Sequence, residues 1–365
     1  MEEIMKKIKQ FIIILFVSVL LGLSLGGYLG VVGAEPSFDR MEFSIIIIML
    51  SAVLSIPVHI LIHEAGHGIA GLLTGFRLVS YRIFDFQIQR KEGKWVKRKV
   101  HIPGTAGQCV MEPKGNWQES NFFFYLLGGG LLNLIVSFIL LYISLELKMG
   151  KFWEIFLGMA IMGVFLGLSN LFPLVLSGVA TDGKNISILR SSTRGKQAIW
   201  SQLKIAALLS DGYMYKDLPE EYFFDFTGFY NENFLTRQMG ILTASYWTSK
   251  GQVLRGEKVL AELDNTNRMQ GLEAMVFSLT KLEILRAKED WILYKEIYES
   301  VKDLIEPLQN TEDGKYAKYI YEKYCLEDHS LAEKTWQEFL QKTETSAYKG
   351  VMETMVEEEK ERQAS

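Results

Sequence analysis

The stretch His63-Glu64-Ala65-Gly66-His67 decides how this chain is interpreted, because it stands at the end of a long apolar segment. Residues 43–62, which lead up to it, contain no Asp, Glu, Lys or Arg. Histidines four positions apart lie on one face of an α-helix, where two imidazoles can hold zinc and the intervening Glu64 can act as a general base. Ionisable side chains inside a membrane are costly and mark functional sites. The stretch therefore predicts a metal centre on a membrane-spanning helix.

The composition divides the chain into two halves of opposite charge. The chain has 365 residues, of which 48% are hydrophobic, and this length predicts about two domains. Up to Arg190 there are 17 Lys and Arg against 13 Asp and Glu, whereas from Ser191 onward there are 22 against 30. The acidic half has no basic stripe, so we expect no nucleic-acid partner. Cys109 and Cys325 lie far apart and predict no disulfide framework.

Four apolar segments are long enough to cross a bilayer: residues 11–33, about 43–74, about 122–147 and about 152–176. The first follows three lysines, and both an uncleaved anchor and a cleaved signal peptide are compatible with it. The loop between the second and third segments is rich in cations, namely Arg77, Arg82, Arg90, Lys91, Lys94, Lys97, Arg98 and Lys99. Such loops face the cytoplasm. We therefore expect a multi-pass plasma-membrane protein with both termini and its C-terminal domain in the cytoplasm.

The same basic loop alternates between apolar and polar residues. Residues 81–88 and 95–102 do so on either side of a turn at 91–94, which predicts a β-hairpin. Residues 104–109 fit either an edge strand that receives an unwound substrate or a plain loop.

After Arg190 the apolar residues recur with a helical period. This predicts helices at 197–209, 237–249, 254–263, 269–287, 291–308, 315–326, 331–341 and 348–362. Their pairing fits a tetratricopeptide-like solenoid or an irregular helical bundle, and the sequence leaves both open.

A catalytic zinc site needs a third protein ligand besides the two histidines, and an open position for water. Asp182 is the best candidate, because it follows the fourth segment and the stretch Asn170-Leu171-Phe172-Pro173. Pro173 breaks the helix there, and irregular backbone at membrane depth is tolerated only where it lines a cavity or is buried in protein. A broken span that carries an acid back to the metal fits this rule. The alternative for Asp182 is a helix cap just outside the membrane.

Taken together, these residues resemble the site-2 protease family of intramembrane zinc metallopeptidases over about residues 43–190. In that family a His-Glu-x-x-His motif lies on one transmembrane segment, and a later segment carries Asn-x-x-Pro followed by Leu-Asp-Gly, whose Asp is the third ligand. The resemblance implies one Zn²⁺ per chain, bound by His63, His67 and Asp182, with Glu64 as the base. Thr181 replaces the usual Leu, and the gap from Pro173 to Asp182 is longer than the commonest pattern.

The family also carries a Gly-rich stretch followed by Asn, and this chain has Gly128-Gly129-Gly130-Leu131-Leu132-Asn133 at that place. The resemblance implies that Asn133 and Asn170 steady the substrate backbone or the oxyanion. His59 lies one helical turn before His63 and is a candidate partner behind the metal ligands, or a structural polar residue.

The expected fold is an all-α polytopic membrane protein with about four transmembrane helices and a small β-hairpin between spans two and three. Residues 1–42 form an N-terminal anchor and external turn, 43–190 the membrane metallopeptidase core, and 191–365 a soluble, cytoplasmic α-helical domain. The expected partners are the lipid bilayer, a transmembrane protein or peptide substrate, and a protein that binds the helical domain.

The expected activity is intramembrane zinc endopeptidase, and two alternatives stay open. One is a membrane metallopeptidase of another clan, in which Glu112 or Glu119 supplies the third ligand. The other is a non-enzymatic scaffold that grips membrane partners. An intact Glu64 argues against a scaffold, which needs no base.

Overall fold

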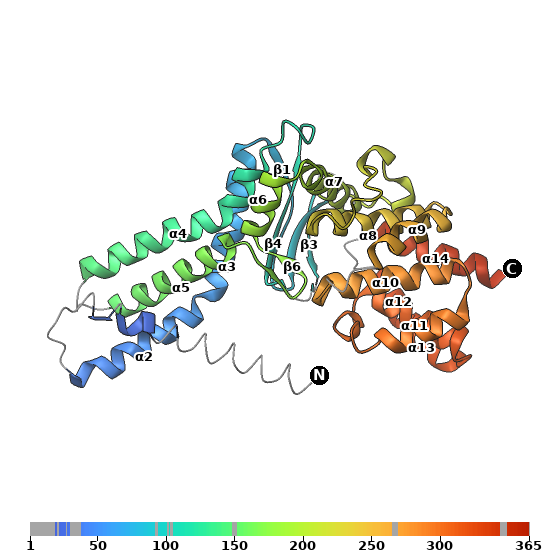
Figure 1. Cartoon of the computed structure of the whole chain (residues 1–365). Helices are drawn as coiled ribbons and strands as arrows, with labels where there is room; N and C mark the ends of the chain where they lie inside the picture. Colours follow the sequence, from blue (N-terminus) through green and yellow to red (C-terminus); the bar gives the residue numbers. More distant parts are fainter. Residues whose placement is uncertain are drawn as a thin grey trace. The chain divides into compact units, whose positions relative to one another are not determined.

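The computed structural model describes residues 19, 22–26, 28–29, 38–91, 94–100, 102, 105–147, 152–264, 269–343 and 349–364. The expected first span, residues 11–33, lies largely outside them. The chain forms two compact units, residues 1–67 with 127–172 and residues 68–126 with 173–365. The described part of the first unit is helical, and the second unit contains the β-strands and the C-terminal helices (Figure 1). The expected domain boundaries at residues 42 and 190 stay predictions.

The apolar segments form long helices: α2 (Phe38–Leu54), α3 (Ile56–Leu73), α4 (Phe122–Leu147) and α5 (Trp153–Leu171). Each of α4 and α5 is long and apolar enough to cross a membrane, and α2 with α3 is a pair bent by 45° that counts as a third candidate span. The described residues thus contain two or three candidate spans, and the expected count of four stays a prediction. Helix α5 ends at Leu171, before the expected residue 176, because Pro173 cannot continue it.

Glycines let the helices of the first unit touch through their backbones. A Cβ atom on Gly66 of α3 would lie 2.2 Å from the carbonyl oxygen of Gly128 of α4, and one on Gly158 of α5 would lie 2.2 Å from that of Ile48 in α2. Small residues at crossings are how helices approach closely where no hydrophobic force drives them together. The backbone of α4 therefore lies directly against the turn of α3 that carries the histidines.

The basic loop forms a four-stranded antiparallel sheet in the order β3-β2-β1-β4, larger than the expected hairpin. Its strands are β1 (Phe76–Ile83), β2 (Phe86–Lys91), β3 (Lys94–Lys99) and β4 (Gly107–Pro113). Lys91 of β2 pairs with Lys94 of β3, and residues 92 and 93 of the expected turn lie outside the described residues. The expected single strand 81–88 is wrong, because the chain reverses at Phe84, whose φ is 49°. Of the expected edge strand 104–109, residues 107–109 belong to β4, which continues to Pro113 and is last in the sheet order. Its role in receiving a substrate stays a prediction.

A second, two-stranded sheet follows Pro173 and was not predicted. Strands β5 (Val175–Leu176) and β6 (Val179–Ala180) are joined by Ser177 and Gly178, whose φ angles of 50° and 79° are those of a tight hairpin turn. Helix α6 (Asp182–Ser191) begins directly after this hairpin. The break at Pro173 thus leads through a hairpin into a helix whose first residue is the predicted metal ligand.

The remaining chain is helical, as predicted. Each expected helix has a counterpart among α7 (Thr193–Ser210), α8 (Phe234–Ser249), α9 (Val253–Asp264), α10 (Gly271–Ala287), α11 (Trp291–Val301), α12 (Glu312–Ile320), α13 (His329–Thr343) and α14 (Lys349–Ala364). The expected helix 291–308 ends early, at Val301, and α12 continues as a π-turn. Buried side chains of α7 and α8, such as Ile199 and Met239, share one core with Phe76 and Met111 of the sheet. The choice between solenoid and bundle stays open.

Candidate metal centre

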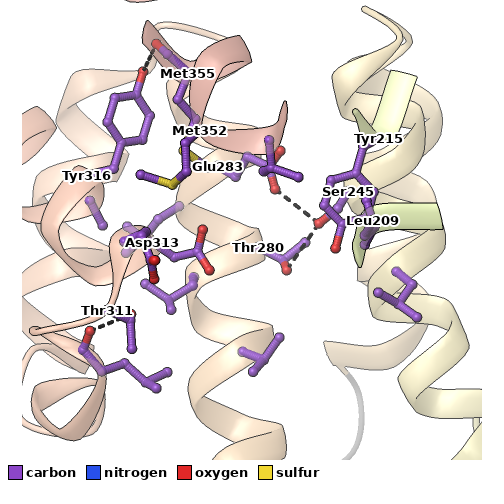
Figure 2. A pocket seen from close by; sticks show the side chains of 18 of the residues that line it. Leu209, Tyr215, Ser245, Thr280, Glu283, Thr311, Asp313, Tyr316, Met352 and Met355 are labelled. Carbon is purple, nitrogen blue, oxygen red and sulfur yellow. Dashed lines mark hydrogen bonds between the residues drawn. The ribbon is translucent and has the colours of Figure 1, made fainter. Parts of the chain in front are cut away.

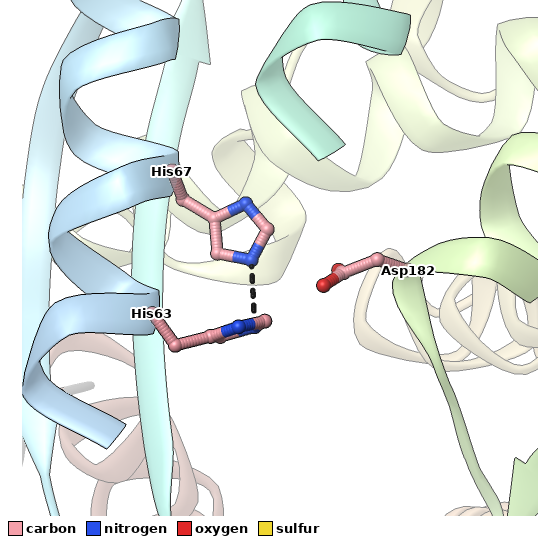
Figure 3. A group of neighbouring side chains, drawn as sticks. All are labelled: His63, His67 and Asp182. Atoms are coloured by element: carbon pink, nitrogen blue, oxygen red, sulfur yellow. Dashed lines mark hydrogen bonds between the residues drawn. The ribbon is translucent and has the colours of Figure 1, made fainter. Parts of the chain in front are cut away.

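Helix α3 brings the two motif histidines together. His63 and His67 are both buried, and their rings meet edge to face with centroids 4.7 Å apart. Their Nε2 atoms lie 3.1 Å from each other (Figure 3). Two nitrogens bound to one tetrahedral zinc ion at about 2.0–2.1 Å lie about 3.3 Å apart. The histidine pair therefore already has nearly the spacing that a shared zinc ion requires.

Asp182 completes a group that could hold a metal ion. One ligand atom from each of His63, His67 and Asp182 lies within 4.8 Å of the other two (Figure 3). Two imidazoles and one carboxylate are a donor set that zinc accepts, and three protein ligands leave a fourth tetrahedral position open. The residues present thus fit the expected ion, and the donor set is the one that the sequence predicted.

Thr181, the residue before Asp182, holds the local backbone through its hydroxyl and its N–H. The Thr181 hydroxyl accepts from the backbone N–H of Lys184 and so caps α6. The hydroxyl also donates to the carbonyl oxygen of Leu174. In turn, the backbone N–H of Leu174 donates to the hydroxyl oxygen, with 3.1 Å between nitrogen and oxygen. The backbone N–H of Thr181 donates to that carbonyl as well. These contacts fix the backbone immediately before Asp182, which is what a metal ligand at a helix start needs.

Glu64 lies on the same turn of α3 as both histidines and is buried, with 7% of its surface exposed. A buried carboxylate beside the metal ligands matches the position expected for a general base. The two glutamates considered as alternative third ligands, Glu112 and Glu119, are not part of this group. Glu112 of β4 forms ion pairs with Arg77 and Lys204, at 2.6 and 3.1 Å. Among the described residues, the metal-ligand group includes Asp182 and neither of the alternative glutamates.

Gly129 keeps the space in front of the histidines open, a role that the sequence did not reveal. A Cβ atom on Gly129 would lie 2.5 Å from Nε2 of His67 and 2.8 Å from Nε2 of His63. That position is close to where an ion bound to both nitrogens has to be. The run of three glycines was visible in the sequence, but only the crossing of α3 and α4 shows which one faces the site.

His59 and Asn133 are buried and contact each other. Nδ1 of His59 lies 3.2 Å from Oδ1 of Asn133, and Nε2 of His59 donates to the carbonyl oxygen of Met159 at 2.8 Å. His59 therefore links α3 to α4 and α5 one turn away from the ligands. Asn170 lies at the end of α5 and is half-buried. The roles expected for these three residues in substrate or ligand positioning stay predictions.

Comparison with known proteins identifies no family: no protein-family model, curated protein or solved structure matches the chain. The functional interpretation therefore rests on the chain's own residues and on the motif resemblance.

Proposed function

We propose that this chain is an intramembrane zinc endopeptidase, similar to site-2 proteases, that cleaves transmembrane segments of membrane proteins or peptide precursors. The observation that supports this most is the grouping of His63, His67 and Asp182, two of them on a helix that belongs to an apolar, membrane-type pair. A buried Glu64 on the same helical turn adds the base that hydrolysis needs. We further propose that the protein lies in the plasma membrane with its C-terminal helices in the cytoplasm.

In this proposal the protein holds zinc through two neutral imidazoles and one carboxylate. Bound zinc supplies a Lewis acid that polarises the scissile carbonyl and lowers the pKa of a neighbouring water molecule. Glu64 takes a proton from the attacking water and later delivers it to the leaving amine. Burial of the two histidines and of Glu64 limits access of bulk water, which strengthens each of these electrostatic interactions.

The substrate has to present an extended backbone, because a helix hides its carbonyl groups in hydrogen bonds. Transmembrane helices that unwind easily are therefore the preferred substrate class. Strand β4, at one end of the sheet, offers a template to which an unwound segment can add as a further strand.

The first test measures bound zinc in full-length protein purified in detergent. We expect about one zinc per chain for the wild type and a loss of zinc for Asp182→Ala, since two ligands alone bind weakly. Asp303→Ala, a change at an exposed position, is the matched control and keeps its zinc. If Asp182→Ala kept its zinc, the third ligand would have to be a residue other than Asp182.

The second test measures cleavage of a panel of single-span substrates in liposomes, with products identified by mass spectrometry. Wild-type protein is expected to cleave substrates that carry helix-breaking residues in their spans. Glu64→Gln should keep its zinc and lose cleavage, because the amide cannot accept the proton. Equal processing by wild type and Glu64→Gln would favour the scaffold over the enzyme.

A further inference from the structure

The second unit contains a partly open cavity of about 460 Å³, lined mostly by its C-terminal helices (Figure 2). Side chains of α7, α8, α10, α12 and α14 line it, among them Leu209, Ser245, Asp313 and Met352. Pockets that bind small molecules have volumes of about 300–1,000 Å³ and are mostly apolar with a few polar groups. This cavity has both properties, since Leu, Val, Ile and Met side chains make up much of its wall.

Helix α10 gives the cavity an apolar end and a charged end. Leu272, Val276, Leu279, Glu283 and Arg286 all line it, at spacings of three and four residues that place them on one face of the helix. A single helix face thus passes from apolar side chains to a carboxylate and a guanidinium. A ligand that lies along α10 has to match this change in polarity.

The charged end is dominated by carboxylates. Glu283, Glu312 and Asp313 line the cavity, and Arg286 is the one cation among the described lining residues. The charge of Arg286 is already engaged, because its Nη2 atom lies 2.8 Å from Oε2 of Glu358. The cavity therefore has more negative than positive charge to offer a ligand.

Glu283 is half-buried in the wall of the cavity, whereas Asp313 is exposed to solvent. Burial raises the pKa of Glu283 to about 7, against the opposing effects of Arg286 and of the Ser245 hydroxyl, which donates to Glu283 Oε2 at 3.0 Å. The pKa of Asp313 is raised in the same direction, by the protein that surrounds its carboxyl group and by the neighbouring Glu312. Carboxyl groups in this condition gain most from a cation that enters without its water shell.

We propose that this cavity binds an apolar molecule that carries a protonated amine, with the ammonium group at Glu283 and Asp313 and the apolar body along α10. A neutral molecule of the same shape leaves the carboxylates without a charged partner. An anion would face three carboxylates and one guanidinium that is already paired. The same chemistry is offered by a small organic amine and by the free α-amino group of an apolar peptide. This site is separate from the metal centre and does not depend on the proposed protease activity.

The test uses full-length protein in phosphatidylcholine nanodiscs and isothermal titration calorimetry. The probes are 4-phenylbutylamine, its neutral analogue 4-phenylbutanol and its anionic analogue 4-phenylbutyrate. The peptide arm compares leucyl-phenylalanine amide, which has a free α-amino group, with its N-acetylated form. We expect 4-phenylbutylamine to bind at least about thirtyfold more tightly than the alcohol, the effect of a close charge pair, and 4-phenylbutyrate not to bind. Tighter binding of the peptide than of the small amine would identify a peptide end as the ligand.

Two variants keep the shape of the cavity and remove its charge. Glu283→Gln and Asp313→Asn should each abolish the preference for amine over alcohol, while Glu296→Gln, at an exposed position on α11, should leave it unchanged. Binding of the amine near pH 6.5 should release protons, so that the measured heat depends on the ionisation enthalpy of the buffer. Equal binding of amine and alcohol, an unchanged preference in Glu283→Gln, or no binding by any probe would each overturn the proposal.

Discussion

Replacing Gly129 by alanine tests the metal centre with a single added methyl group. A Cβ atom at this position would lie 2.5 Å from Nε2 of His67 and 2.7 Å from Cε1 of His63, whereas ordinary contacts begin at 3.4 Å. The imidazoles or α4 must therefore retreat by about 0.9 Å, and metal–ligand distances tolerate changes of only about 0.2 Å. We expect zinc affinity to fall by about 100-fold or more, because two ligands are displaced together.

The assay is a titration of purified protein with a competing chelator, followed by measurement of zinc per chain after gel filtration. Gly68→Ala is the matched control. It adds the same methyl group on α3 beside His67, where the nearest atom is the Sγ atom of Cys109 at 3.7 Å. Both variants should retain wild-type helicity by circular dichroism, since alanine favours helices by about 1 kcal/mol over glycine. If Gly129→Ala bound zinc as tightly as wild type, the placement of the ion between the two imidazoles would be refuted.

Three further predictions concern other parts of the chain. In Glu64→Gln, zinc content measured by mass spectrometry should stay at the wild-type level, whereas the rate of peptide-bond cleavage should fall by at least about 100-fold; a comparable loss of zinc would give Glu64 a role in metal binding. Gly178→Ala should lower zinc affinity, because its Cβ atom would lie 2.2 Å from a backbone oxygen before α10 and so shift the hairpin that leads to Asp182. Gly228→Ala is the control, because Gly228 has nearly the same left-handed φ as Gly178, 78° against 79°, and a Cβ atom on it would have nothing within 4 Å. Zinc binding by Gly228→Ala should match that of wild type. Equal losses of zinc affinity in Gly178→Ala and Gly228→Ala would point to backbone strain alone. For Glu283, the folded-state pKa of about 7 exceeds the ordinary 4.5, so the folded protein binds more protons and loses stability as pH rises between these values, by up to about 3 kcal/mol. Thermal unfolding should therefore show Glu283→Gln to be more stable than wild type near pH 8 and equal to it near pH 4.5, and a pH-independent difference would contradict this reasoning.

The last of these predictions also bears on the cavity. A carboxyl group that costs stability at neutral pH is the kind of group that proteins keep for binding. Glu283 is half-buried among apolar side chains of α10 and receives one hydrogen bond, from Ser245. A stabilising Glu283→Gln change that also removes amine binding would show both effects at one residue.

The sequence by itself determined the features that depend on neighbouring residues. The four-residue spacing of His63 and His67 within an apolar segment predicted that both lie on one face of a helix. Helical periodicity located α7 to α14, and Pro173 predicted the break that ends α5, because a proline beyond the first turn removes a backbone donor and clashes with the preceding turn. The strand pattern was less informative. Phe84 adopts a left-handed conformation that its residue type does not announce, so one expected strand became two.

The tertiary structure decided what depends on residues far apart in the chain. A sequence motif points to Asp182, but only the structure groups it with the two histidines, after a hairpin at Ser177 and Gly178 that two-residue strands do not signal. The role of Gly129 depends on the crossing of α3 and α4. No sequence pattern singled out the cavity carboxylates Glu283 and Asp313, since periodicity gives a residue's place on its own helix and not what packs against it. Long-range packing sets burial, and burial sets the charge behaviour of a carboxyl group.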